Sequence, residues 1–276
     1  MLINCDFEME QAKMETTFNW NSEAYAAANS IQASVGERLI ESIPFMPDMA
    51  VLDAGCGSGN LTVLLAQKVP DGQVLAIDSS ASMIQKAEEF TTARNTQNVI
   101  FQVCGINEFD LSEQFDIIFT NSVLHWVIEI EEGLKRMFAA LKSGGLFAAQ
   151  FPMLNAEHPL IKYASRSIKA LGLKKRYEKW HFPWFVPNSR EQFIGMLKEA
   201  GFDEPEVSME SNMFAFPSAE AVYQHFNSVG LDLLAAPLCE EEKELFLNRI
   251  MSDLKEDFPD EAFLRYERIF TKARKA

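Results

Sequence analysis

The sequence of 276 residues lacks the usual marks of a membrane span, a metal site or a disulfide framework. No apolar run reaches the roughly 20 residues that a transmembrane helix needs. The acidic start, MLINCDFEMEQ, has no long apolar segment, so we expect no signal peptide. Four cysteines are scattered without disulfide or metal-ligand spacing: Cys5, Cys56, Cys104 and Cys239. These absences favour a cytoplasmic protein with reduced thiols, no bound metal and no membrane partner.

Positive charge is scarce as well. Lysine and arginine number 25 against 40 aspartates and glutamates, which gives a formal net charge of -15. Such a chain would repel the phosphates of nucleic acids and the surface of anionic membranes. We therefore expect a small-molecule substrate and no nucleic-acid partner, and we leave the oligomeric state open.

Strands and helices alternate from residue 51 onward. Continuous apolar strands separated by helices predict a mostly parallel sheet covered on both faces. With right-handed crossovers, this order gives a doubly wound α/β fold. The expected strands are MAVLDAG, GQVLAIDSS, NVIFQVCG, FDIIFTNS and LFAAQFP, and the helices between them are LTVLLAQKV, ASMIQKAEEFTTAR and EEGLKRMFAALK.

The stretch VLDAGCGSGN joins the first strand to its helix and places glycines at alternate positions, Gly55, Gly57 and Gly59. Glycines there let a ligand approach the backbone closely. The dinucleotide motif needs a third glycine where this chain has Asn60, and the Lys-Ser/Thr pair of a phosphate-binding P-loop is absent. A nicotinamide dehydrogenase is therefore disfavoured. Asp53, just before the glycines, would repel a pyrophosphate but suits an ammonium group.

The second strand ends in Asp78, where a carboxylate can accept hydrogen bonds from a ribose diol. The ligand should then carry a ribose and both a positive and a negative charge. S-adenosylmethionine meets these requirements.

Several motifs in order resemble the class I S-adenosylmethionine-dependent methyltransferases: DAGCGSG from Asp53, Asp78, FDIIFTNSVLHWV and LKSGGLF. The segment WNSEAYAAANSIQ and the tail from VYQHF resemble the trans-aconitate methyltransferase branch, and NSIQ and LHWV also resemble the juvenile hormone acid methyltransferases. The resemblance implies a seven-stranded Rossmann-like sheet with a helical cap. It also implies S-adenosylmethionine as cofactor, S-adenosylhomocysteine as product, and no metal.

This family pattern suggests a division of the chain into four parts. We expect an N-terminal helical lid at 1–50 and an S-adenosylmethionine-binding core at 51–152. A helical, aromatic-rich cap insertion at 153–190 and the remainder of the sheet with C-terminal helices at 191–276 complete the chain.

The resemblance also suggests residues that hold the cofactor. Asp53 would face the methionine ammonium, although it could simply cap the turn. Asp78 would hold the ribose, and Asn121 would lie near the methionine end unless it only forms an Asx turn. Gln32 could hydrogen-bond a carboxylate of cofactor or substrate. The other expected cofactor contacts are Ala54, Gly55, Cys56, Gly57, Ser79, Met83, Ile106 and Asn107.

Adenine recognition is the point at which the sequence departs from the family. Gly105 stands where the family often has an acid that accepts a hydrogen bond from the adenine amino group. The backbone of Ile106 and the side chain of Asn107 or Glu108 are the candidate substitutes. Met83 fits either an adenine contact or the core.

Aromatic residues suggest an apolar acceptor site. Trp20 and Tyr25 would belong to the lid, and Trp126 would form a wall beside the cofactor. The cap would add Trp180 and Trp184. Core packing explains these aromatics about as well.

The two named relatives act on carboxylates, and a carboxylate needs no general base because it is ionised at neutral pH. We therefore expect O-methylation of a carboxylic acid. Methylation of nitrogen, carbon or a hydroxyl, and a non-catalytic S-adenosylmethionine-binding protein, are the alternatives. His125 is the candidate base or orienting donor if one is needed. Because Gln32 and Asp232 stand where the aconitate branch carries positive charge, we expect an apolar or weakly charged acid rather than a tricarboxylate.

Overall fold

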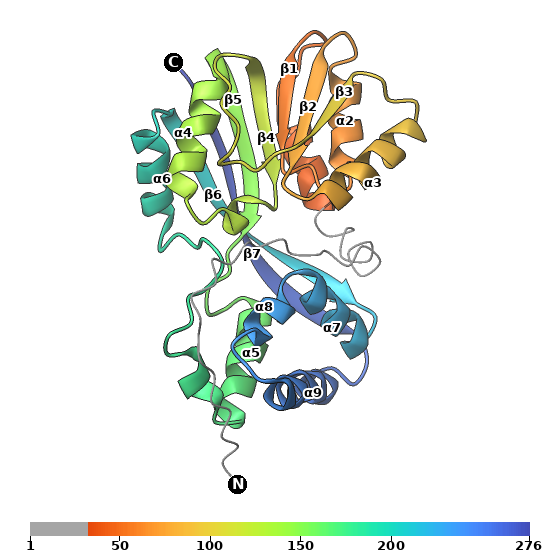
Figure 1. The fold of residues 1–276 in the computed structure, drawn as a ribbon, viewed down its shortest axis with the longest axis vertical. Coiled ribbons are helices and arrows are strands. Elements are labelled where there is room, and N and C mark those ends of the chain that lie inside the picture. The colour runs from red at the N-terminus through yellow and green to blue at the C-terminus, as the bar shows by residue number, and fades with distance from the viewer. Residues whose placement is uncertain (1–32) are drawn as a thin grey trace. The chain divides into compact units, whose positions relative to one another are not determined.

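The computed structural model describes residues 33–276 and contains a seven-stranded sheet in the order β3-β2-β1-β4-β5-β7-β6 (Figure 1). The pairs among the first five strands are parallel, and β7 runs antiparallel to β5. The predicted doubly wound, mostly parallel α/β fold is confirmed. The strands are β1 Ala50–Ala54, β2 Gln73–Asp78, β3 Val99–Val103, β4 Phe115–Asn121, β5 Leu141–Pro152, β6 Asp203–Phe216 and β7 Ala262–Arg274.

Helices connect these strands, and the predicted helices lie where the apolar periodicity placed them. The first described helix covers 33–41, and the part of the predicted N-terminal helical lid that precedes it lies outside the described residues. The other helices are α2 Asn60–Lys68, α3 Ala81–Thr92, η1 Leu124–Trp126, α4 Ile130–Ala140, α5 Pro159–Ala170, η2 Leu173–Tyr177, α6 Arg190–Glu199, α7 Ala219–Ser228, α8 Leu231–Ala235 and α9 Glu240–Asp257.

Two compact units share the described chain. The sheet unit consists of 33–159, Pro183–Phe214 and Phe263–Ala276, and the helical unit consists of Leu160–Phe182 and Ala215–Ala262. The predicted division of the chain into lid, core, cap and remainder assigns a role to each part. The grouping into two compact units does not test those roles, so the division stays a prediction.

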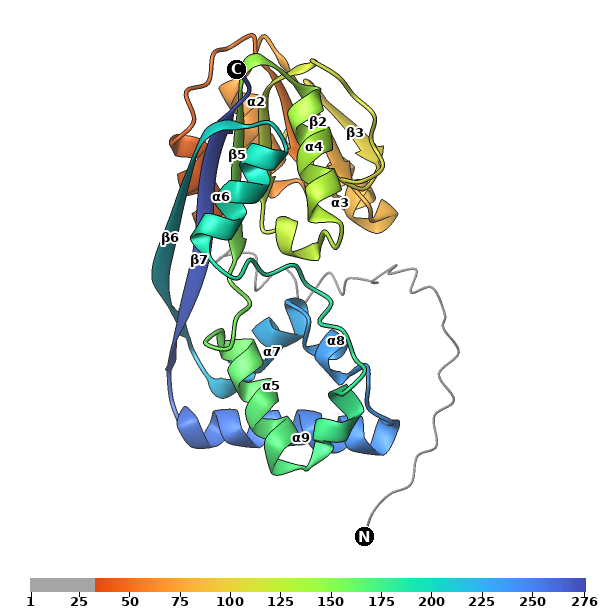
Figure 2. The ribbon, with the colours of Figure 1, turned by 90° about the vertical axis from the view of Figure 1, so that its left-hand side faces the viewer.

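Both faces of the sheet are covered, as expected for buried parallel strands. On one face, side chains such as Phe147 and Phe151 pack against residues of α4 and α6. Figure 2 shows these two helices on the same side of the sheet. On the other face, Ile117 and Phe119 pack against α2 and the helix 33–41. The central strands β1 and β4 are therefore buried along nearly their whole length rather than at alternate positions.

Local sequence signals fix where the helices begin and end. The side chain of Ser80 accepts a hydrogen bond from the N–H of Met83 and so caps the start of α3. Ser189 caps α6 in the same way, through the N–H of Gln192 at 3.1 Å. Gly201 follows α6 with a φ of 110°, which explains why the helix stops there.

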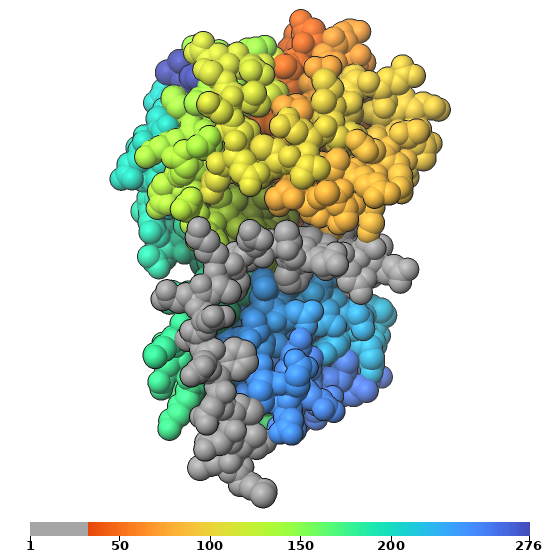
Figure 3. Space-filling model, viewed as in Figure 1, coloured from red at the N-terminus to blue at the C-terminus, as the bar shows by residue number. Residues whose placement is uncertain are grey.

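The edge strand β3 carries two exposed apolar side chains, Ile100 at 50% and Val103 at 52% exposure. Figure 3 shows the surface that α3 and the chain around β3 present on that side of the sheet unit. No helix among residues 33–276 is long and apolar enough to span a membrane.

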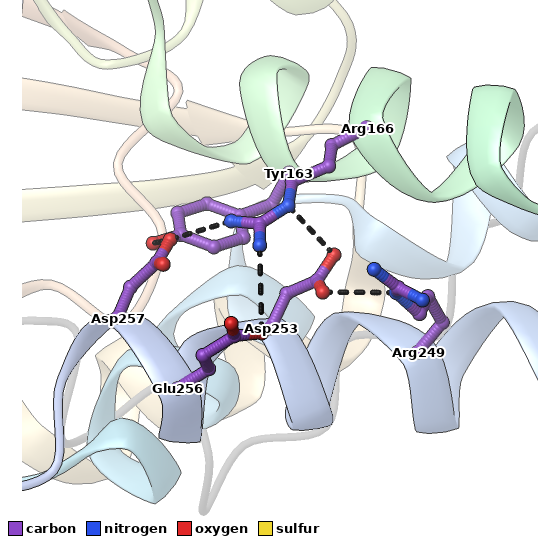
Figure 4. Close-up of polar contacts among 6 residues, drawn as sticks. All are labelled: Tyr163, Arg166, Arg249, Asp253, Glu256 and Asp257. Atoms are coloured by element: carbon purple, nitrogen blue, oxygen red, sulfur yellow. Dashed lines mark hydrogen bonds and ion pairs between the residues drawn. The ribbon is translucent and has the colours of Figure 1, made fainter.

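The helical unit is held together by an ion-pair network between α5 and α9 (Figure 4). Asp253 is only 1% exposed and lies between Arg166, at 3.3 Å, and Arg249, at 2.9 Å. Arg166 also pairs with Asp257 at 2.7 Å, and the hydroxyl of Tyr163 donates to the same carboxylate at 2.8 Å. Because the buried carboxylate is paired on both sides, its burial is compensated.

Candidate active site

The glycine turn leaves β1 and enters α2 through residues with left-handed backbone. Gly55, Gly57 and Gly59 have φ values of 84°, 53° and 82°. The N–H groups of Gly55 and Cys56 both donate to the carbonyl of Ile77 in β2, at 2.8 and 2.9 Å. The turn is therefore tied to the end of the neighbouring strand.

Two of these glycines also have no room for a side chain. A Cβ on Gly55 would lie 2.3 Å from Cγ2 of Val123, in the segment that follows β4. A Cβ on Gly59 would lie 2.9 Å from Cβ of Ala87 in α3. The turn thus packs closely against the end of β4 and against α3, so glycine is required here even before a ligand is considered.

Asp53 is buried at the end of β1, with 2% of its surface exposed. Its Oδ2 accepts a hydrogen bond of 2.7 Å from the hydroxyl of Thr62. Burial raises the pKa of Asp53 to about 7, although the Thr62 bond lowers it and the charge of Asp78 raises it further. The chain therefore keeps a carboxylate beside the turn whose ionisation a nearby cation would favour.

Asp78 ends β2 and binds the turn directly. Its Oδ2 accepts from the N–H of Gly57 at 3.0 Å, and its Oδ1 accepts from the N–H of Ser80 at 2.9 Å. Burial raises the pKa of Asp78, while these two hydrogen bonds lower it. Each carboxylate oxygen retains a lone pair for a further donor.

The thiol of Cys56 has its pKa raised by burial and then by the charge of Asp53, so it stays protonated. Ala54 is fully buried. Ala54 can therefore meet a ligand only through its backbone, whereas Cys56 is partly exposed.

At the end of β3, a carboxylate occupies the space beside Gly105. Oε2 of Glu108 accepts a hydrogen bond of 2.7 Å from the N–H of Gly105. A Cβ on Gly105 would lie 3.2 Å from the carboxyl carbon of Glu108. The acid that the sequence lacks at Gly105 is thus brought to the same place by a side chain three residues later.

The other predicted adenine contacts lie nearby but differ in their surroundings. Ile106 and Met83 are buried, with Ile106 in the core beneath α4. Oδ1 of Asn107 has no hydrogen-bond partner among the described residues and lies 2.9 Å from where a Cβ on Gly133 would be. Ser79 is exposed. The side chain of Glu108, rather than that of Asn107, reaches the end of β3.

A polar cluster joins the ends of β4 and β5 to the middle of β7, and of its members only Asn121 was predicted. The amide of Gln150 donates to Oδ1 of Asn121 and, at 2.9 Å, to the hydroxyl of Ser122. Arg268 of β7 donates through Nη1 to Oε1 of Gln150 at 2.8 Å and to the hydroxyl of Ser122 at 3.3 Å. Apart from Asn121, the only sequence feature that points to this cluster is Arg268 itself, a basic residue in the segment RYERIF near the end of the chain.

His125 belongs to the turn η1 after β4 and is 5% exposed. Burial lowers the pKa of His125 well below its ordinary value, and the positive charge of Arg268 lowers it further, with a smaller contribution from His158. The imidazole is therefore neutral at pH 7. Its Nδ1 has no hydrogen-bond partner among the described residues.

Comparison with known proteins identifies the family of this chain. The family model described as a methyltransferase domain matches residues 46–201, which include the glycine turn, Asp78 and the end of β4. The chain belongs to this methyltransferase domain family.

Similar proteins extend beyond the matched domain. The trans-aconitate 2-methyltransferase of Deinococcus radiodurans is 28% identical over 249 residues, covering 88% of this chain and 92% of the relative. The malonyl-[acyl-carrier protein] O-methyltransferase of Priestia megaterium is 30% identical over 136 residues, 48% of each chain.

Solved structures agree on the fold. Haemonchus contortus phosphoethanolamine N-methyltransferase 2, in complex with phosphomonomethylethanolamine and S-adenosylhomocysteine, aligns with a TM-score of 0.60 at 17% identity. The alignment covers 94% of this chain and 59% of that chain. The protein is an S-adenosylmethionine-dependent methyltransferase, as predicted, and not merely a binding protein.

The tryptophans predicted to line the acceptor site of this methyltransferase are only partly brought together. Trp126 and Trp184 meet edge to face, with 5.6 Å between ring centroids, and the N–H of Phe185 donates to the carbonyl of His125 at 2.8 Å. Trp180 belongs to the helical unit and packs against Tyr177 there. The remaining predictions, Trp20, Tyr25 and Gln32, lie outside the described residues.

Proposed function

We propose that this methyltransferase transfers a methyl group from S-adenosylmethionine to the carboxylate of a small, weakly charged acid and so forms a methyl ester. The cofactor supplies a methyl group that its positively charged sulfur activates for displacement. The chain's own residues then have three tasks: to bind, to align and to exclude water.

The residues at the glycine turn fit the methionine end of the cofactor. A buried carboxylate with a pKa near 7 makes no ion pair among the described residues, so Asp53 is ready for the methionine ammonium. The cofactor can approach the backbone closely at Ala54, Gly55, Cys56 and Gly57. Asn121 lies at the end of β4, the strand beside β1.

The residues of β2 and β3 fit the nucleoside end. Asp78 accepts from the ribose hydroxyls while it continues to hold the turn through Gly57. Glu108 accepts from the adenine amino group in place of the acid absent at Gly105. Ser79, Met83, Ile106 and the backbone of Asn107 flank the ring.

The neutral, buried state of His125 is the observation that carries the choice of acceptor. A hydroxyl or ammonium acceptor must lose a proton, and a base is most effective when its pKa lies near the working pH. The pKa of His125 lies well below that range. A carboxylate acceptor is already ionised and makes no such demand.

The relatives and the aromatic pair support the same class of substrate. One relative is named for trans-aconitate, which is a carboxylic acid, and another is named an O-methyltransferase. Trp126 and Trp184 give the acceptor an apolar wall. A cytoplasmic location and the absence of nucleic-acid and membrane partners remain predictions from the sequence.

The proposal is tested by incubating the protein with methyl-labelled S-adenosylmethionine and a panel of mono-, di- and tricarboxylic acids, alcohols and amines. Mass spectrometry should show one added methyl on an acid, and mild alkali should release the label as methanol, because methyl esters hydrolyse whereas methyl ethers and methylamines do not. Turnover of trans-aconitate should be lower than that of medium-chain monocarboxylates such as octanoate. Alkali-stable label on an alcohol or amine, with no labelled acid, would refute the proposal.

A further inference from the structure

Arg268 carries a positive charge into the interior of the sheet unit. Its side chain lies in the antiparallel strand β7 and is 4% exposed. Burial lowers the pKa of Arg268, but only to about 10, so the guanidinium remains charged at neutral pH. A buried charge is costly unless something of opposite charge faces it.

No carboxylate among residues 33–276 faces this guanidinium. Its hydrogen bonds go to neutral groups, namely the amide of Gln150 and the hydroxyl of Ser122. The titratable groups that it influences are His125 and Tyr266, and both are neutral at pH 7. Nε of Arg268 is buried and has no hydrogen-bond partner in the described part of the chain.

The partners of Arg268 hold the guanidinium in place rather than neutralise it. Gln150 is completely buried, and its amide also binds Asn121 and Ser122, which fixes its orientation. Ser122 has a left-handed backbone with a φ of 58°, which is unusual for a residue other than glycine. Such strain is kept where the surroundings enforce it, commonly at ligand sites.

The cluster lies at the edge of the sheet that carries the glycine turn. Asn121 is paired in register with Gln150, which is paired with Phe270, two residues from Arg268. Val123, immediately after Ser122, is the residue that packs against Gly55. Asn121, Gln150 and Arg268 therefore continue one face of the sheet past its apolar core, next to the turn.

The order of the strands places Arg268 on the side of β1 opposite to Asp78. Asp78, the proposed ribose ligand, is on β2, to one side of β1, whereas β4, β5 and β7 follow on the other side. With neighbouring strands about 4.8 Å apart, β7 lies roughly 14 Å from β1, away from the nucleoside.

We propose that Arg268 binds the carboxylate of the methyl acceptor, with Gln150 and Ser122 as the residues that position its guanidinium. This inference rests on the proposed function and refines it: one buried positive charge suits an acid with one carboxylate at the site. A guanidinium can hold a carboxylate through two parallel N–H donors. Nε, which has no partner in the described residues, supplies one of them.

The test compares Arg268→Met with Arg265→Met, a matched control because Arg265 lies on the same strand but is exposed. We expect Arg268→Met to lower kcat/KM for the acid found in the panel by at least about 30-fold, through loss of a buried charge partner. Arg268→Lys should recover part of this loss, and Arg265→Met should change little. Equal kcat/KM in wild type and Arg268→Met, with the wild type active on an acid, would overturn the inference but leave the proposed function intact.

Thermal unfolding without turnover separates binding from a structural role. Without an acid present, Arg268→Met should unfold at the same temperature as wild type or higher, because an uncompensated buried charge has been removed. Octanoate should raise the unfolding temperature of wild type and Arg265→Met but not of Arg268→Met. A large drop in the unfolding temperature of Arg268→Met would mean that the arginine is structural, and the inference would fail.

Calorimetric titration with S-adenosylhomocysteine distinguishes the two carboxylates that could bind here. Its affinity for Arg268→Met should stay within about threefold of wild type if Arg268 binds the acceptor. A loss of 30-fold or more would assign the guanidinium to the cofactor's own carboxylate and would overturn the inference. Because the octanoate shift needs no methyl transfer, it tests Arg268 even if the panel shows no methylated acid.

Discussion

The carboxylate of Glu108 folds back onto the backbone of Gly105, with 2.7 Å between Oε2 and the amide nitrogen. Glu108 is exposed, and a side chain on Gly105 would come within 3.2 Å of its carboxyl carbon. A glycine at this position and a glutamate three residues later therefore combine to place an acid at the end of β3. The local pattern departs from the family, and we propose that Glu108 takes the role of the acid that is missing at Gly105.

Removal of this carboxylate should weaken recognition of adenine. We expect Glu108→Gln to bind S-adenosylhomocysteine about tenfold less tightly, which corresponds to one hydrogen bond to a charged group. Wild type should also prefer the adenine compound to its 6-oxo analogue, and Glu108→Gln should lose most of that preference. Isothermal titration calorimetry measures both quantities. Asp110→Asn, an exposed acid of the same loop, is the control; an equal preference in Glu108→Gln and wild type would rule out this assignment.

Asp53 should make the free energy of unfolding decrease as the pH rises. Burial raises its pKa from the ordinary 3.8 to about 7, so the folded protein keeps a proton that the unfolded chain has lost. That contribution to stability disappears as the pH rises from about 4 to about 7. Asparagine carries no charge at any pH. The unfolding temperature of Asp53→Asn relative to wild type should therefore be higher at pH 8 than at pH 5, and calorimetry at both values checks this.

The same residue should control cofactor affinity. Without the carboxylate, the methionine ammonium loses its partner. S-adenosylhomocysteine should therefore bind Asp53→Asn at least about tenfold less tightly than wild type. Affinity of the wild type should rise between pH 5.5 and pH 7 as Asp53 ionises. Thr62→Ala, which removes the hydrogen bond to Oδ2, should move this rise to higher pH. A pH-independent affinity in wild type would speak against contact with the ammonium.

Gly55→Ala should destabilise the protein by about 3 kcal/mol, because a left-handed backbone and a close contact act together. The new Cβ would lie 2.3 Å from Val123. Gly144→Ala is the matched control, since Gly144 has a φ of 77° with nothing within 4 Å of the added atom, and it should cost only about 1 kcal/mol. Urea denaturation measures both. The double variant with Val123→Ala should recover part of the loss; no recovery would show that the contact is not the cause.

His125 should contribute little to the methylation of an acid. Its neutral imidazole has no proton to remove from a carboxylate, so His125→Ala should retain kcat within about fivefold, whereas loss of a true general base costs 100-fold or more. The plot of log kcat against pH should be flat between pH 6 and pH 8. A 100-fold loss in a folded variant, together with an inflection in that range, would favour a hydroxyl or amine acceptor.

Asp253 should be the residue on which the α5–α9 contact depends. Asp253→Asn removes the charge between Arg166 and Arg249 and should lower stability by about 1–3 kcal/mol. Glu256→Gln is the control, because Glu256 is 73% exposed and lies 3.7 Å from Arg166. Its loss should be within about 0.5 kcal/mol. Similar losses in the two variants would mean that burial of Asp253 does not matter.

The sequence by itself determined the parts of this protein that depend on local backbone and on periodicity. The alternation of apolar strands with helices predicted the doubly wound sheet, because parallel strands buried on both faces need apolar runs. The glycines between β1 and α2 predicted the turn, because left-handed backbone at three alternate positions suits no other residue type as well. Asp53 and Asp78 followed from their positions at the ends of β1 and β2.

Only the tertiary structure decided which distant side chains meet. Arg268 reaches Gln150 across 118 residues of chain and Ser122 across 146. That meeting depends on β7 running antiparallel beside β5, with Pro152 opposite Arg268. Pairing register between strands so far apart is set by packing of the whole sheet, and no local pattern records it. The sequence therefore predicts a cofactor site at the glycine turn, and the fold determined that Arg268 meets Gln150 and Ser122.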